Sequence, residues 1–237
     1  MLATAFAMNA TTTGITSHHE PVRAECTEIL GQQMVIGPAR TIEAKEHIFR
    51  EGDAVTHVYK VEIGHVCIYK TLSDGRRQVI DFAYPGDMIA LGALGEHTCN
   101  AQATTRTRVR FVPVPALRQA VRSDGSLGLR LCEAISRELL ASRELLFTVS
   151  QRTATERVAS FLVALARRNE RKDEDCDEFV LPMTRSDIAD FLGLTIETVS
   201  RTFTKLRLDG LIELAQSVLV TILDRERLEE LADGRSD

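Results

Sequence analysis

The chain has 237 residues, and 44% of them are hydrophobic, so it is long enough to bury a sizeable core in one large or two modest domains. The formal net charge of −5 argues against a protein that binds nucleic acid through overall positive charge, and leaves only a local basic face for that purpose. Tryptophan is absent and aromatic residues make up 5%, which argues against a stacking platform for single strands.

The cysteines are five in number, lie far apart and include no CxxC pair: Cys26, Cys67, Cys99, Cys132 and Cys176. This pattern favours neither a disulfide framework nor a closed zinc or iron–sulfur site, so we expect no metal and no bound cofactor. No run of about 18 apolar residues could span a membrane, and no basic region of a signal peptide precedes the first apolar residues. We therefore expect a cytoplasmic protein with reduced thiols and no membrane partner.

The first 125 residues divide into a tail and a β-rich region. Residues 1–27 are rich in Ala, Thr, Ser and His, which predicts a flexible N-terminal tail. In residues 28–125, short stretches of alternating apolar and polar residues lie between turn signals, which predicts a β jelly roll. The turn Ser73-Asp74-Gly75 is expected to join a hairpin between Cys67–Thr71 and Gln78–Phe82.

Known ligand chemistries of such a roll make specific demands on the sequence. A metal-binding roll needs a close histidine pair, whereas the histidines here are scattered: His47, His57, His65 and His97. A cyclic-nucleotide pocket needs a carboxylate for the ribose and an arginine for the phosphate after the Pro85-Gly86-Asp87 turn. The sequence has Glu96 there but no arginine before Arg106. Since no nucleophile elbow is present either, we expect neither an enzyme nor a cyclic-nucleotide receptor.

Beyond the roll, apolar residues recur every three to four positions from Leu127 to Val149, which predicts one long helix over residues 126–151. We interpret it as a dimerisation helix, and an amphipathic helix that packs within its own domain is the alternative. The residues expected in the dimer interface are Leu131, Ile135, Leu139, Leu145 and Val149. A two-fold dimer places two DNA-reading helices roughly 34 Å apart, which predicts a palindromic DNA site.

Residues 152–237 carry the pattern of a winged helix-turn-helix domain. Thr184 and Asp187 predict a capping box, and Gly193 predicts the left-handed end of the first short helix. Thr195 is expected to cap the second helix, whose apolar face is Val199, Phe203 and Leu206. An amphipathic helix (Thr155–Arg168) and a short strand (Phe179–Leu181) are expected before this motif, and a hairpin of Leu211-Ile212 with Val218–Leu223 and a helix (Arg225–Leu231) after it.

The opposite face of the second helix has the chemistry of a major-groove reader. Glu197, Ser200 and Arg201 are neighbours on a helix surface because they are three and four positions apart. Arginine can donate two hydrogen bonds to guanine, glutamate can accept one from cytosine, and an apolar side chain such as Ile196 can contact a thymine methyl group. The alternative is an ordinary solvated ion pair between Glu197 and Arg201.

A jelly roll, a long helix and a winged helix-turn-helix in this order resemble the CRP/FNR family of bacterial transcription regulators, over about residues 28–223. The ExxSR pattern within GLTIETVSRTFTKL resembles the FNR branch, whose half-site begins TTGA; the cyclic-AMP branch has arginine at position 196 and glycine at position 200. The resemblance implies that Arg201 reads guanine, Glu197 the neighbouring base pairs, and Ser200 and Ile196 the thymines. It also implies contacts with phosphate from Thr184, Arg185, Thr195, Thr198 and Lys205.

The family's known sensors are only partly matched. The N-terminal zone that carries the iron–sulfur cysteines in FNR has Cys26 alone, and the cyclic-nucleotide signature is missing. What remains is similar to FixK-type regulators of rhizobia, which implies a homodimeric activator of microaerobic respiration, nitrogen-fixation or denitrification genes that contacts RNA polymerase. The Ser73–Arg77 turn is a candidate surface for that contact. There are two alternatives: a haem-dependent nitric-oxide regulator of the same family, and a small-molecule-binding module whose winged helix contacts protein.

Cys176 is a candidate for redox control. It lies in a charged loop shortly before the helix-turn-helix, where oxidation would add negative charge near DNA phosphate and weaken binding. Four neighbouring acidic residues would disfavour the thiolate and slow this chemistry, so an inert surface cysteine is the alternative. We expect the other four cysteines in or near the core.

Overall fold

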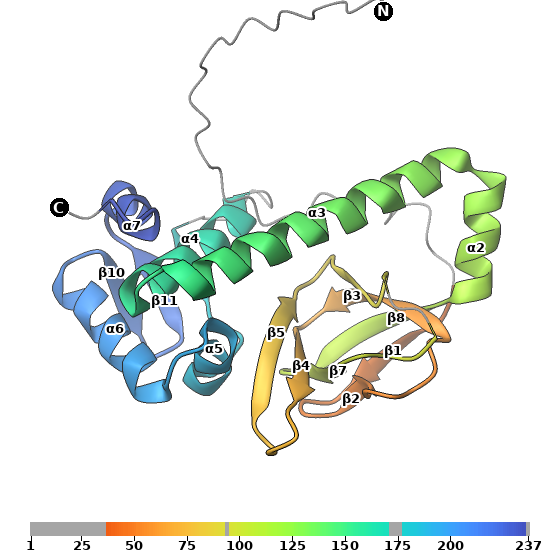
Figure 1. Ribbon diagram of the computed structural model, residues 1–237, viewed down its shortest axis with the longest axis horizontal. Helices are drawn as coiled ribbons and strands as arrows, with labels where there is room; N and C mark the ends of the chain where they lie inside the picture. Colours follow the sequence, from red (N-terminus) through yellow and green to blue (C-terminus); the bar gives the residue numbers. More distant parts are fainter. Residues whose placement is uncertain (1–36, 93–94, 171–176, 236–237) are drawn as a thin grey trace, which may run out of the picture.

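The structure is a computed structural model that describes residues 37–92, 95–170 and 177–235. The predicted tail, residues 1–27, and Cys176 lie outside the described residues. Figure 1 shows a β domain, a long helix that runs past it, and a second domain of short helices and strands at the far end of that helix. The arrangement of domains therefore follows the order predicted from the sequence.

The β domain consists of two four-stranded antiparallel sheets with the strand orders β1-β8-β3-β6 and β2-β7-β4-β5. Its strands are β1 (Ala39–Ile42), β2 (His47–Phe49), β3 (His57–Ile63), β4 (Val66–Thr71), β5 (Arg77–Ala83), β6 (Met88–Ile89), β7 (Asn100–Ala103) and β8 (Thr107–Pro113). Side chains that alternate along these strands, such as Val61 and Val109, fill the space between the sheets. The predicted jelly roll is confirmed.

The predicted β4–β5 hairpin is also confirmed. The strand β4 begins one residue earlier than expected, and β5 extends one residue further at each end. Gly75 in the connecting turn has φ 84°, a conformation that glycine adopts without steric cost. The strand β5 lies at the edge of its sheet, next to β4 only. Its free edge therefore needs a cover, since an open edge exposes unpaired backbone groups.

Two helices follow the last strand of the roll, α2 (Val114–Ser123) and α3 (Gly125–Gln151). The predicted long helix is confirmed to within one residue, whereas the sequence analysis did not recognise α2 as an element. Asp124 separates the two helices, and its carboxylate accepts a hydrogen bond from the Ser126 N–H at 2.9 Å, which caps α3. At 27 residues, α3 is about 40 Å long and reaches from α2 to the second domain (Figure 1).

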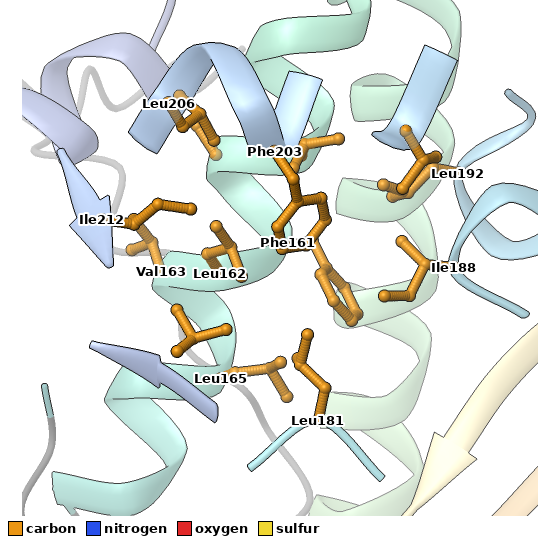
Figure 2. Packing of buried hydrophobic residues seen from close by; sticks show 14 of the residues in the cluster. Phe161, Leu162, Val163, Leu165, Leu181, Ile188, Leu192, Phe203, Leu206 and Ile212 are labelled. Carbon is orange, nitrogen blue, oxygen red and sulfur yellow. The ribbon is translucent and has the colours of Figure 1, made fainter. Parts of the chain in front are cut away.

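The second domain is a winged helix whose three-stranded sheet has the order β10-β11-β9. Its elements are α4 (Ala154–Glu170), β9 (Glu178–Val180), α5 (Arg185–Leu192), α6 (Ile196–Leu208), β10 (Ile212–Ala215), β11 (Leu219–Ile222) and α7 (Arg225–Ala232). Figure 2 shows that α4 supplies Phe161 and Leu162 to a core that also receives Ile188, Leu192 and Phe203 from the two short helices. This core continues into the β domain through Cys67, Val79 and Phe82.

The structure divides the apolar stripe that was expected at a dimer interface. Leu131 packs on the small core between the roll and α2, Leu145 faces Phe161, and Val149 lies beside Gly193, so these three are half-buried within one chain. Of the expected five, Ile135 and Leu139 are exposed. Together with four other exposed apolar residues of this helix they form what we call the outward face of α3: Leu129, Ile135, Leu139, Leu140, Leu146 and Phe147.

The expectation for the cysteines is wrong at one position. Cys67 is buried and Cys99 is half-buried, but Cys132 is exposed, because it lies on the same side of α3 as Leu129 and Leu139. Cys26 lies outside the described residues. Within the described parts of the chain, no helix has the length and apolarity that a membrane span requires.

Candidate nucleic-acid interface

The first helix of the helix-turn-helix motif, α5, has the predicted capping box. The Thr184 hydroxyl oxygen accepts from the Asp187 N–H at 3.1 Å, and the Asp187 carboxylate accepts from the Thr184 N–H at 3.0 Å. At the other end, Gly193 has φ 64° and ψ 40°, so the chain turns sharply into the next helix. These two local signals set the length and exit direction of α5.

The second helix, α6, is capped and anchored as predicted. The Thr195 hydroxyl oxygen accepts from the Thr198 N–H at 3.2 Å. Val199, Phe203 and Leu206 are at most 2% exposed and pack on α4 and α5. Because one face of α6 is locked into the core, the opposite face is held at a fixed angle to the domain.

The opposite face of α6 presents the predicted base-reading residues together. Ile196, Glu197, Ser200 and Arg201 are all exposed and occupy the first two turns of the helix. No ion pair within 4.0 Å joins Glu197 to Arg201, both of which the structure describes, so the predicted alternative of a closed surface pair is not formed. Both charged groups are available to a ligand in front of the helix.

The pKa of the Glu197 carboxyl is lowered because its own backbone N–H and the Thr195 hydroxyl donate hydrogen bonds to it, with a further contribution from the charge of Arg201. The group is therefore ionised at neutral pH and acts only as an acceptor. In a groove lined with phosphate, an anionic acceptor is repelled unless it meets a donor such as the cytosine amino group.

The predicted phosphate-binding residues fall into two groups. Thr184, Thr195 and Lys205 are exposed near the ends or outer side of the two helices, and the half-buried Thr198 hydroxyl lies 3.0 Å from that of Thr195. Arg185 has a different position. Its guanidinium lies over the Phe203 ring at 3.5 Å and donates to the Ser217 carbonyl at 3.3 Å.

Arg185 therefore ties α5 to α6 and to the wing, and burial lowers the pKa of this arginine. The wing itself is the tight turn between β10 and β11, where Gln216 and Ser217 have φ of 51° and 62°. Two successive residues with positive φ make a tight turn, which the hydrogen bond from the Val218 N–H to the Ala215 carbonyl closes at 3.2 Å. Gln216 and Ser217 are exposed, and Arg185 holds their turn through the Ser217 carbonyl.

Sequence reasoning missed a second supporting arginine. The Arg157 guanidinium, on α4, donates to the Leu192 carbonyl at 3.1 Å and to the Arg152 carbonyl at 2.9 Å. It thereby satisfies a carbonyl at the C-terminal end of α5. No local pattern reveals this role, because the two partners are 35 positions apart in the chain.

The described parts of the chain hold no group of three His, Cys, Asp or Glu side chains that could bind a metal ion. The features that do converge are a capped and anchored helix, a polar reading face at its N-terminal end, and a wing beside it. This is the arrangement by which a helix-turn-helix places one helix in the major groove of DNA.

Comparison with known proteins agrees with both domains. Residues 156–231 match the family of Crp-like helix-turn-helix domains, and residues 39–124 match the cyclic nucleotide-binding domain family. The structure resembles that of FixK2 from Bradyrhizobium japonicum, with a TM-score of 0.78 and 34% identity over 83% of this chain and 98% of that chain.

Curated relatives are transcriptional regulators rather than enzymes. The nitrogen fixation regulation protein FixK of Bradyrhizobium diazoefficiens is 40% identical over 79% of this chain and 78% of its own length. The transcriptional activatory protein AadR of Rhodopseudomonas palustris is 38% identical over 90% of this chain and 86% of its own. The nitrogen fixation regulation protein FixK of Rhizobium meliloti is 37% identical over 87% of this chain and 93% of its own length. The chain therefore belongs to the CRP/FNR family of DNA-binding transcription regulators.

Proposed function

We propose that the protein is a FixK-type transcription activator that binds a TTGA–TCAA palindrome as a homodimer, without a cyclic nucleotide or an iron–sulfur cluster. Its proposed targets are genes of microaerobic respiration, nitrogen fixation or denitrification, of which nitrogen fixation is the one that the names of the FixK relatives give. The observation that carries the proposal is the exposed set of Glu197, Ser200 and Arg201, with no ion pair between Glu197 and Arg201, on a helix whose other face is locked into the core.

Each reading residue has a partner in the TTGA half-site. The Arg201 guanidinium can donate to the O6 and N7 atoms of the guanine, and Glu197 can accept from the amino group of an adjacent base. Ser200 adapts to either role, while Ile196, which is 46% exposed, can pack on a thymine methyl group. Thr184, Thr195 and Lys205 are exposed, and we expect them to contact the flanking phosphates.

The outward face of α3 supports the homodimer. Leu129 and Leu146 are each 69% exposed, and Phe147 is 53% exposed, on a helix that is otherwise packed at both ends. A row of large apolar side chains in water favours association, and the same helix of a second copy offers the same row. Two such chains related by a two-fold axis would present two α6 helices to the two halves of a palindrome.

Independence from cyclic nucleotide is supported by the position of the nearest arginine after the Pro85-Gly86-Asp87 turn. Arg106 lies in the turn between β7 and β8, is 76% exposed at its side chain, and forms an ion pair with Glu43 at 3.4 Å. It is directed to the surface, whereas a phosphate buried in the roll would need a charged donor inside it.

The test is fluorescence anisotropy at a stated salt concentration with a labelled TTGA–TCAA palindrome and a scrambled duplex, each with and without cyclic AMP. We expect selective binding to the palindrome that cyclic AMP leaves unchanged. Equal affinity for both duplexes would refute the specificity, and selective binding only with cyclic AMP would refute effector independence. Selective binding that appears only after haem is added would favour the haem-dependent alternative.

A further inference from the structure

The free edge of the β domain is covered by the DNA-binding domain. The edge strand β5 lies against α5, as Figure 1 shows, and Val79 and Phe82 of β5 belong to the same hydrophobic core as Ile188 and Leu192 of α5. The helix-turn-helix is thus docked on the jelly roll through an interface with an apolar centre. Polar contacts between the two domains lie at the start of β5 and just beyond its end.

The first polar contact is at the start of β5. The Arg77 guanidinium lies over the Tyr69 ring at 4.2 Å and donates to the Cys67 sulfur at 2.8 Å, so both neighbours on β4 hold it in place. It forms an ion pair with Asp187 at 3.1 Å, with the two side chains 32% and 13% exposed. Asp187 is the capping residue of α5, so Arg77 connects the jelly roll directly to the first helix of the DNA-reading motif.

The second contact lies just beyond the other end of β5, and its charges are reversed. Asp87 of the jelly roll and Arg168 of α4 form an ion pair at 2.7 Å with side chains that are 0% and 7% exposed. The guanidinium also lies over the Tyr84 ring at 4.3 Å. The Asp87 carboxylate accepts from the Tyr84 N–H at 2.9 Å, so the turn before β6 is tied to the same pair.

Between these pairs, the interface is closed by further contacts. The Gln78 side chain donates to the Asp190 carbonyl at the end of α5, and the Phe82 and Phe191 rings are 5.4 Å apart. A single contact would leave the domain free to pivot. Two charged contacts on opposite sides of an apolar centre, one to α5 and one to α4, define an orientation.

We propose that Arg77 and Arg168 are positioning residues for DNA recognition, which hold the helix-turn-helix on the edge of the jelly roll at the angle needed to reach both halves of a palindrome. The inference rests on the proposed function, since it explains how the motif can be ready for DNA without an effector. The jelly roll then serves as a fixed scaffold for the reading helix.

The reasoning predicts how a variant at Arg77 should differ from one that removes a DNA contact. Loss of a base contact relaxes specificity at one base pair, and loss of a phosphate contact lowers the slope of log affinity against log salt by about one per site. Loss of a positioning contact lowers the affinity for the palindrome but leaves the base preference and the salt slope unchanged, because every DNA-contacting side chain is still present.

The experiment compares Arg77→Met with Arg76→Met in the full-length protein. Arg76 is a matched control: it lies in the same hairpin, carries the same charge, is 77% exposed and forms its ion pair with Asp74 of the same turn. We expect Arg77→Met to weaken binding to the palindrome about three- to tenfold, at an unchanged salt slope and base preference, while Arg76→Met stays within about twofold of the wild type.

Hydrogen–deuterium exchange provides a readout that does not depend on DNA. In Arg77→Met we expect faster exchange in α5 and β5 and unchanged exchange in β3 and β8, whereas general unfolding would accelerate all of them. Arg168→Lys tests the second pair while keeping its charge, because lysine cannot reproduce the flat stacking on Tyr84. We expect it to accelerate exchange in α4 near position 168 and to weaken palindrome binding several-fold.

A double variant with Asp187→Asn completes the test. If Arg77 acts through Asp187, the effects of Arg77→Met and Asp187→Asn on DNA affinity will be less than additive. Wild-type affinity and exchange in both Arg77→Met and Arg168→Lys would overturn the inference, as would a lowered salt slope in Arg77→Met, which would make Arg77 a phosphate contact. If the wild type lacks sequence preference while the exchange pattern still changes as expected, the docking role stands and the proposed DNA site fails.

Discussion

The outward faces of α6 and α3 are both exposed to solvent, but their side chains differ in kind. On α6 the exposed residues of the first two turns include Glu197, Ser200 and Arg201, which water solvates well. On α3 they include Leu139, Leu146 and Phe147, each more than half exposed. A polar face is compatible with a free state and a bound state, which suits a site that binds and releases DNA.

An exposed apolar face, by contrast, favours the bound state, because water solvates it poorly. Burial of one leucine or phenylalanine side chain stabilises an association by roughly 1.5–3 kcal/mol before the entropy of association is subtracted. The difference between the helices therefore fits the two partners proposed above: a second copy of the chain on α3 and an exchangeable nucleic acid on α6. The following predictions test each half of this comparison, beginning with the largest effect.

The largest effect is expected from charging the outward face of α3. The double variant Leu139→Asp, Leu146→Asp places four carboxylates in the proposed two-fold interface, where they would repel one another and lose their hydration. We expect a monomer by analytical ultracentrifugation and a loss of palindrome affinity of more than about a hundredfold, because each half-site is then bound alone. Glu133→Ala, on an exposed flank of α3, is the control and should stay dimeric. A variant that remains dimeric would disprove the assignment of this face.

A smaller effect is expected from removing the cap beneath the reading face. Thr195→Ala deletes the hydroxyl oxygen that accepts from the Thr198 N–H, which should lower the free energy of unfolding by about 1 kcal/mol and weaken DNA binding. The matched control is Thr204→Ala on the same helix, whose hydroxyl only donates to the Ser200 carbonyl within the helix. The control should leave the free energy of unfolding unchanged or raise it, since alanine is the better helix former. Equal losses in chemical denaturation would show that the cap is unimportant.

The smallest effect is a difference in thiol reactivity between the core and α3. Burial raises the pKa of the Cys67 thiol to about 12, against an ordinary value near 9, so this thiol stays protonated and unreactive from pH 7 to 10. Because only the unfolded chain ionises the thiol in that range, Cys67 also makes the folded state less stable as the pH rises from about 9 towards 12.

Cys132, exposed beside Leu129 and Leu139, should react with a maleimide in the double variant and several times more slowly in the wild type, where the proposed dimer interface would cover it. Peptide mapping by mass spectrometry separates the two sites. Rapid labelling of Cys67 in the folded protein at pH 8 would contradict its buried position, and equal labelling of Cys132 in both proteins would place it outside the interface.

The parts of the structure that were predictable depend on local signals. Thr184 with Asp187, and Gly193 nine positions later than Thr184, define α5 because caps and left-handed turns are decided by neighbouring residues. The helix α3 was predictable for the same reason, because its apolar residues recur every three to four positions along a long stretch of the chain. The α2 helix was missed because it is short and follows β8 directly at Pro113, without a side-chain cap.

What the sequence could not reveal are relations across long distances. Both sides of α3 carry large apolar residues, so periodicity alone could not tell Leu145, which faces its own domain, from Leu146, which faces solvent. The pairing of Arg77 with Asp187, and of Gln78 with an α5 carbonyl 112 positions away, depends on how two domains meet. Arg185 likewise matched the family's phosphate pattern but lies over the Phe203 ring, which only the packed domain shows.

The central claim is that Arg201 reads one base pair of the half-site. The most direct measurement is the affinity of wild type and Arg201→Ala for the TTGA–TCAA palindrome and for versions with a single substituted base pair in each half-site, with Arg207→Ala as an exposed control on the same helix. We expect the wild type to lose roughly 1–3 kcal/mol per half-site when the guanine is replaced, and Arg201→Ala to bind both duplexes equally weakly while it still discriminates at the other positions. If Arg201→Ala keeps its preference for guanine, the reading face of α6 has been wrongly assigned.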